Sequence, residues 1–269
     1  MFGQLKVLFV LLGAAVVLAG CGGNSGSGSG AVPVSGIAGT GAPVVGGTVA
    51  IVCNGGTAVT SATPTGSDGS FSVTATSGSA PCVIRITGGN IVGGGSLVSV
   101  VLTVGQARAN VNQLTHALAA ALAGGDPGTL FTTPSGLSRI TSTNYGLAKK
   151  AIVDNVIAIV GGAISSSIAA FDFDTATYTA DGTLFDRLLD LVSFSISGTT
   201  GTVIYKPTGG TLLGLNLTTI VVTITSTLTV AQVQAALPDL LGLLAFEEDR
   251  KSTRLNSSHI QKSRMPSSA

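Results

Sequence analysis

The chain has 269 residues, of which 45% are hydrophobic and 9% are charged, and its formal net charge is +1. A chain this apolar and this weakly charged can bury enough surface to offset the entropy of ordering, which excludes a wholly disordered protein. The near-zero charge also excludes binding driven by basicity, so no nucleic-acid partner is expected.

The first 20 residues have the pattern of a signal peptide. Lys6 precedes an apolar run, Val7–Val17, that is too short to span a bilayer. The run ends in Leu18-Ala19-Gly20-Cys21, which resembles the bacterial lipobox, where the cysteine thiol is acylated and the preceding peptide is removed. The resemblance implies a membrane-attached lipoprotein with its lipid on Cys21, and Gly22 implies export to an outer membrane. An ordinary secretory signal is the alternative.

Residues 21–31 are expected to be the lipid anchor and a flexible linker. Gly22 to Gly30 consists of Gly, Ser and Asn, which predicts a coil whose ends lie roughly 17 Å apart. Residues 32–104 then alternate short β-prone runs with turn signals, at the spacing of a small β-sandwich. Alternation along the strands places two sets of side chains on core faces: Val49, Ile51 and Cys53 in one run, and Cys82, Ile84 and Ile86 in another, with Val83 and Arg85 on the opposite face of the second.

Two cysteines remain when Cys21 is acylated, and in an exported protein Cys53 and Cys82 most simply form a disulfide. Closing this loop would stabilise the fold by about 3 kcal/mol in the chain-entropy model. Two buried free thiols are the alternative.

The same region resembles a known family. Gly41-Ala42-Pro43-Val44-Val45-Gly46-Gly47-Thr48-Val49, followed by Thr65-Gly66-Ser67-Asp68-Gly69-Ser70-Phe71, is similar to the carboxypeptidase regulatory-like, prealbumin-type sandwich. The resemblance implies that a strand opens after a tight turn, and that Asp68-Gly69 forms a hairpin that directs Phe71 into the core. Gly66 departs from the family, which usually has Asp or Asn there. The implied role is a noncatalytic spacer or recognition module.

After Gly105 the hydrophobic period becomes helical. A helix is predicted from about Asn112 through an alanine-rich segment that stops at Gly124-Gly125-Asp126-Pro127. A longer apolar helix is predicted from Leu147 to about Ala170. Its polar start, its internal glycines and its serine run favour a helix packed in a core over a membrane span.

Further elements are predicted beyond this helix. Thr183-Leu184-Phe185-Asp186 has the form of a capping box and opens a short helix through Val192. A hairpin follows, with strands at 193–197 and 202–206 and a turn at 198–201, and then a strand at 217–225 and a helix at 230–237. Residues 105–248 are therefore predicted as a mixed helical and β-hairpin region, which makes the whole chain α+β.

Residues 249–269 differ abruptly from the rest of the chain, because five of their residues are basic. Asp249 to His259 and Ser263 to Ala269 each resemble one reading frame of a common sequencing adapter, interrupted at 260–262. We therefore expect this segment to be an adapter-derived artefact; a natural basic tail is the alternative. Without the segment, 8 basic and 11 acidic residues remain, and removal of Lys6 with the signal leaves a net charge of −4.

Catalytic residues are not evident in the remaining chain. His116 is its one histidine outside the adapter-like tail, and it lies in a predicted helix where a packed or surface role is expected. The acidic run Asp172, Asp174, Asp181, Asp186 and Asp190 offers oxygen ligands or acid/base pairs, but its spacing does not match the twelve-residue calcium loop. We therefore expect no catalytic site, no metal site and no cofactor.

The expected function is that of a lipid-anchored protein of the bacterial cell envelope, acting as a binding or structural module for an unidentified protein partner. The alternative is the anchor and accessory portion of an exported enzyme whose catalytic residues follow Glu248. A third hypothesis is a small-ligand carrier built around the apolar helices.

Overall fold

The computed structural model describes residues 31–160, 172–180, 186, 189–190, 192–197, 200–206 and 210–216. Within them the fold is mixed α+β, with several sheets and a few helices, as predicted. The predicted signal peptide, Cys21, the strand at 217–225, the helix at 230–237 and the adapter-like tail all lie outside the described residues.

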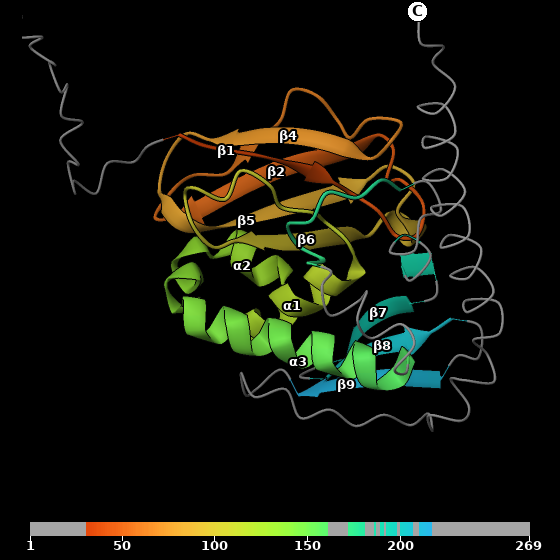
Figure 1. Ribbon diagram of the computed structural model, residues 1–269. Helices are drawn as coiled ribbons and strands as arrows, with labels where there is room; N and C mark the ends of the chain where they lie inside the picture. Colours follow the sequence, from red (N-terminus) through yellow and green to blue (C-terminus); the bar gives the residue numbers. More distant parts are fainter. Residues whose placement is uncertain are drawn as a thin grey trace, which may run out of the picture.

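The N-terminal strands form two sheets (Figure 1). β1 (Val32–Ile37) pairs with β4 (Ser70–Ala75), and a four-stranded antiparallel sheet has the order β3-β2-β5-β6. The strands of the second sheet are β2 (Gly47–Asn54), β3 (Val59–Thr60), β5 (Ser79–Gly88) and β6 (Ser96–Val101), with a short 3-10 turn at Val92–Gly94 before β6.

The segment 107–111 extends the first sheet. It runs parallel to β1, and the Ala109 N–H donates to Ser35 O at 2.9 Å while the Val111 N–H donates to Ile37 O at 2.9 Å. Glycine is required at position 36, because a Cβ there would lie 2.0 Å from Ala109 O. This segment of the predicted C-terminal region therefore pairs with the first strand of the predicted N-terminal region.

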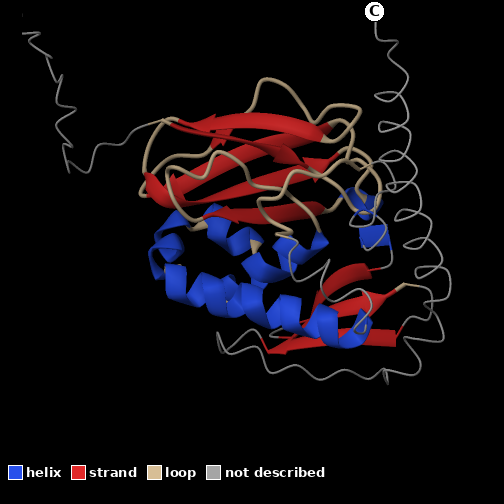
Figure 2. Cartoon of the chain, viewed as in Figure 1, coloured by secondary structure: helices blue, strands red, loops and turns tan. Residues whose placement is uncertain are grey.

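Three helices lie on the side of the four-stranded sheet that faces away from β1 and β4 (Figure 2); the first two contact the sheet and the third packs against the first. They are α1 (Gln113–Ala123), α2 (Gly128–Thr132) and α3 (Ser142–Val160), with a 3-10 turn at Pro134–Arg139. α1 begins at a capping box made by Asn112 and Thr115, and it ends at Gly124, which has φ +72°. The predicted stop of this helix is confirmed.

Two hydrophobic cores lie on the two faces of the four-stranded sheet. The core between the sheets contains Val34, Phe71, Ile51 and Ile84. The core under the helices contains sheet residues of the opposite parity, including Val52, Val83, Val98 and Val100, together with α1, α2 and α3. Because both faces of the sheet are buried, its strands contain consecutive apolar residues and show little alternation of apolar and polar side chains.

A third sheet lies beside the helices and has the order β7-β8-β9. Its strands are β7 (Val192–Ser197), β8 (Thr200–Tyr205) and β9 (Gly210–Asn216). The predicted hairpin at 193–206 is confirmed, although Ser197 pairs with Thr200 and the turn is shorter than predicted. Asp186, Leu189 and Asp190 are helical, but Val192 already belongs to β7, so the prediction of a helix through Val192 was wrong.

Two other predictions need correction. Gly69 has φ +77° and forms a turn next to Asp68, but β4 pairs with β1, so Asp68-Gly69 does not join a hairpin. Phe71 does enter the core, with 6% of its surface exposed. The long helix begins at Ser142, five residues before the predicted start, and residues 161–170 of the prediction lie outside the described residues.

Candidate functional site

The two core cysteines form the predicted disulfide. Cys53 in β2 and Cys82 in β5 are directly opposite each other in the antiparallel pair, and both side chains are fully buried. The alternation that placed Cys53 with Val49, and Cys82 with Ile84, is confirmed, since all four lie in the core between the sheets.

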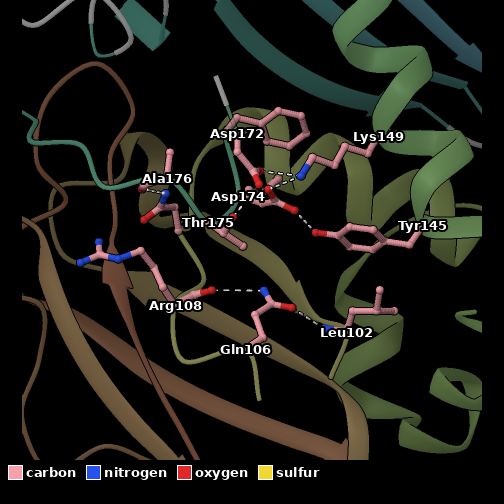
Figure 3. A network of polar contacts seen from close by, with 12 residues as sticks. Leu102, Gln106, Arg108, Tyr145, Lys149, Asp172, Asp174, Thr175 and Ala176 are labelled. Atoms are coloured by element: carbon pink, nitrogen blue, oxygen red, sulfur yellow. Dashed lines mark hydrogen bonds and ion pairs between the residues drawn. The ribbon is translucent and has the colours of Figure 1, made fainter. Parts of the chain in front are cut away.

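A polar network joins α3 to the segment 172–180, which we call the strap (Figure 3). Lys149 Nζ lies 2.5 Å from Asp172 Oδ1 and 2.7 Å from Asp174 Oδ1. Tyr145, one helical turn before Lys149, donates its hydroxyl hydrogen to Asp174 Oδ2. The Thr175 hydroxyl donates to Asp172 Oδ2 at 2.6 Å. One ammonium group therefore pairs with two carboxylates of the strap.

Burial and charge act together on the titrations of this network. Burial raises the pKa of Asp172, but the hydrogen bonds from Lys149 and Thr175 outweigh it and hold the pKa below its usual value. Burial, and secondarily the charge of Asp172, raises the pKa of Tyr145 well above its usual value. The carboxylate of Asp172 thus stays ionised and the phenol of Tyr145 stays protonated at neutral pH.

Two buried asparagines fasten the backbone of the strap. Asn110 Nδ2 donates to Ala176 O at 2.8 Å, and Asn112 Nδ2 donates to Phe173 O at 2.9 Å. The backbone N–H of Asn110 also donates to Asp174 O at 2.6 Å. Both asparagine side chains are fully buried, so their amide groups use their hydrogen-bonding capacity within the protein.

The acidic run does not come together as one cluster. Asp172 and Asp174 share Lys149, whereas Asp186 is buried near Tyr178. Burial of Tyr178 raises the pKa of its hydroxyl, and the charge of Asp186 raises this pKa further. Asp190 is exposed next to Gly41, where a Cβ would lie 2.0 Å from Asp190 Oδ1. Asp181 lies outside the described residues. Within the part of the chain that the structure describes, no group of three His, Cys, Asp or Glu residues could hold a metal ion.

His116 is packed between three elements, as a structural histidine would be. Its Nδ1 accepts the Val98 N–H at 3.1 Å, and its ring meets the Phe194 ring edge-on with centroids 5.4 Å apart. Burial lowers the pKa of His116 to about 4, against the opposing charge of Asp126. The ring is therefore neutral at pH 7 and uses Nδ1 as an acceptor.

Sequence reasoning missed the partners of Lys149. The Tyr145–Lys149 spacing of four residues on a helix was a usable signal that both side chains share one face. The strap that completes the network lies 23 to 29 residues further along the chain, where no local periodicity points back to α3. A second missed contact is Arg85, whose guanidinium lies 4.0 Å from the centroid of the Phe131 ring.

In the described residues, none of the helices has the length and apolar character that crossing a membrane requires. Comparison with known proteins found no matching family model, no similar curated protein and no similar solved structure.

Proposed function

We propose that this chain is a lipid-anchored protein of the bacterial cell envelope, held at the outer membrane through acylated Cys21. The observation that carries the proposal is Leu18-Ala19-Gly20-Cys21 between an apolar run and a Gly/Ser linker. The disulfide between Cys53 and Cys82 supports it, because structural disulfides persist in exported proteins and are rare in reducing compartments.

The role we propose for the folded part is that of a binding or structural module. The charged groups of the strap network support this role, since Lys149, Asp172 and Asp174 are engaged with one another. His116 likewise uses its acceptor nitrogen on a backbone amide of β6. Lys149 and its two carboxylates join α3 to the strap, and His116 joins α1 to β6.

We further propose that residues 32–104 are a carboxypeptidase regulatory-like, prealbumin-type sandwich. Support comes from the β1–β4 pair, which lies across a shared core from β2, β5 and β6. Gly46 and Gly69, at the two turns that carry the resemblance, both have positive φ. In this chain the outer face of the larger sheet is covered by helices, so the proposal is a sandwich with a helical extension.

The anchoring proposal is tested by replacing Cys21 with serine. We expect wild-type protein to incorporate a fatty-acid analogue and to sediment with membranes, and Cys21→Ser to lose both properties. The double variant Cys53→Ala/Cys82→Ala is the matched control, because it removes the other two cysteines and should keep the label. Labelling or membrane retention that survives in Cys21→Ser would contradict the proposal.

The alternative proposal is that this chain is the anchor and accessory portion of an exported enzyme, and the adapter-like residues 249–269 mark the place in the gene where the two proposals can be tested. Sequencing the native gene through the codon for Glu248 distinguishes the two. A stop codon soon after that position favours the binding or structural module. A long continuation with a catalytic triad or a metal-binding motif favours the enzyme.

A further inference from the structure

His116 lies where the N-terminal sheet, the helices and the third sheet meet. Its backbone belongs to α1, its Nδ1 accepts a hydrogen bond from Val98 in β6, and its ring contacts Phe194 in β7. A change at the His116 ring therefore affects the contacts of α1 with both the four-stranded sheet and the third sheet.

Among the described residues β6 is an edge strand, because the order of its sheet ends β2-β5-β6. On its outer side an edge strand has backbone N–H groups for which no neighbouring strand offers a carbonyl acceptor. Proteins cover such edges to prevent pairing with other chains. Side chains accept two N–H groups here: His116 Nδ1 takes that of Val98 at 3.1 Å, and Gln106 Oε1 takes that of Leu102, just after β6, at 2.9 Å. The two acceptors differ in that imidazole titrates and a carboxamide does not.

The hydrogen bond from Val98 requires a neutral imidazole. A protonated ring carries hydrogen on both nitrogens, so Nδ1 would then face the Val98 N–H as a second donor. The Val98 N–H would lose its acceptor, and the charge would lie in a largely desolvated position. Burial lowers the pKa of His116 to about 4, which is the direction expected when the fold disfavours the charged ring.

Few charges lie near His116 in the part of the chain that the structure describes. Apart from His116, the sequences of α1, β6 and β7 contain no titratable side chain, and Asp126, just after α1, is the charge that favours the protonated ring. The sequence of β8 contributes Tyr205. α3 carries Tyr145, Lys149, Lys150 and Asp154, and each of them has a partner: Lys149 binds the strap carboxylates, Tyr145 binds Asp174, and Lys150 pairs with Asp154.

We propose that His116 is an acid-operated latch: when its ring takes up a proton, the β6 edge and the β7 side of the third sheet are released from α1. Neutral His116 covers the edge at Val98, whereas Gln106 covers it at Leu102 at every pH. The latch depends on the described residues alone and is independent of acylation at Cys21.

The pH range of the latch follows from the two states of the ring. In the open state the ring has the ordinary pKa of about 6.5, and in the closed state it has a pKa of about 4. The open state therefore binds more protons between these values, so the contribution of the ring to closure is complete above about pH 6.5 and is lost as the pH falls toward 4. The equilibrium constant for opening should rise by roughly 300-fold between the limits well above pH 6.5 and well below pH 4, and by roughly 60-fold between pH 7 and pH 4.5.

The test is hydrogen–deuterium exchange of the full chain at single-amide resolution between pH 7 and pH 4.5, with rates corrected for intrinsic exchange. We expect protection of the Val98 amide and of the 192–206 hairpin to fall as the pH falls, while protection of the Leu102 amide changes little. In His116→Gln, whose carboxamide is an acceptor that does not titrate, the protection of Val98 should no longer depend on pH over this range.

Constant protection of Val98 down to pH 4.5 would overturn the latch. Parallel loss at Val98 and Leu102 would overturn it too, since this would show general acid unfolding. The comparison of the two amides within the wild-type chain remains decisive if His116→Gln fails to fold.

Discussion

At the scale of single residues, neighbouring lysines of α3 have different surroundings. Lys149 contacts Asp174, whose side chain is 2% exposed, whereas Lys150 pairs with Asp154 on the surface of the helix. Exposed ion pairs contribute little to stability, because water and salt screen them. A buried carboxylate that loses its partner keeps its desolvation cost and has no compensating attraction.

Lys149→Met should therefore lower the free energy of unfolding by about 2–3 kcal/mol, because it leaves Asp174 buried without its cation. Lys150→Met, the matched control one residue away, should change it by less than about 0.5 kcal/mol. Urea denaturation of both variants at pH 7 measures the difference. Equal losses in the two variants would show that the strap network adds nothing beyond a surface ion pair.

Protonation of Asp172 acts in the same network. Its pKa is held below the ordinary value in the folded chain, so the stabilising contribution is present above about pH 4 and is lost as the pH falls through the lowered value. Asp172 therefore titrates at a lower pH than most of the pH 6.5 to 4 range over which His116 acts, so the two groups reduce stability in separate steps as the pH falls.

At the scale of elements, the start of α1 also fixes the position of the strap. The Asn112 side chain accepts the N–H groups of Leu114 and Thr115 at 2.9 Å each, and its Nδ2 donates to Phe173 O. One buried side chain thus caps a helix and holds a segment 61 residues further along the chain. The local part of this role is a common helix-start signal, and the distant part is a tertiary contact.

Asn112→Ala should reduce the free energy of unfolding by about 2–4 kcal/mol, because it removes the cap and leaves the Phe173 carbonyl without its donor. Asn144→Ala is the control, since Asn144 Nδ2 makes an exposed contact with Arg139 O at 3.3 Å. Thermal unfolding followed by circular dichroism compares the two. An Asn112→Ala variant as stable as Asn144→Ala would contradict the assigned role.

The disulfide acts on the pair β2–β5. Cys53 and Cys82 are 29 residues apart, so the chain-entropy model assigns the link a stabilisation of about 3–4 kcal/mol. Cys53→Ala/Cys82→Ala should lose about that amount in denaturant unfolding. A thiol assay before and after reduction of wild type is the independent check, with two more thiols expected after reduction; an unchanged count would exclude the bridge.

At the scale of the whole molecule, the four-stranded sheet has no solvent face of its own. Its second face contributes Val52, Val83, Val98 and Val100 to the core under the helices. Burial of four valines contributes at least about 6 kcal/mol, which is comparable with the total stability of a typical domain. The segment 107–111 adds backbone pairing to β1 from the same C-terminal side.

A fragment ending at residue 104 should therefore fail to fold as a soluble monomer. Residues 31–216 are the matched control, because both fragments contain Cys53 and Cys82 and differ in the helices, the strap and the third sheet. Size-exclusion chromatography and denaturant unfolding provide the comparison. A monomeric 31–104 fragment with a cooperative transition would show that the N-terminal sheets fold without the helices.

Local signals were enough to predict several features. Alternation placed Cys53 and Cys82 on buried faces, and the disulfide between them is confirmed. The glycines after Ala123 ended α1 as predicted, since a residue with positive φ stops a helix. Such features depend on side-chain periodicity and on backbone preferences over a few residues, and both can be recognised in the sequence alone.

Long-range partners were not predictable in this way. The pairing of β4 with β1, the parallel segment 107–111 and the strap on Lys149 each join residues far apart in the chain, and the polar groups involved fit many local arrangements. By itself the sequence determined the α+β class, the disulfide partners and the end of α1, because these follow from local period and from thiol count. Only the tertiary structure decided what covers the second face of the sheet and which charge balances Asp174, because both depend on surfaces that meet after the chain has folded.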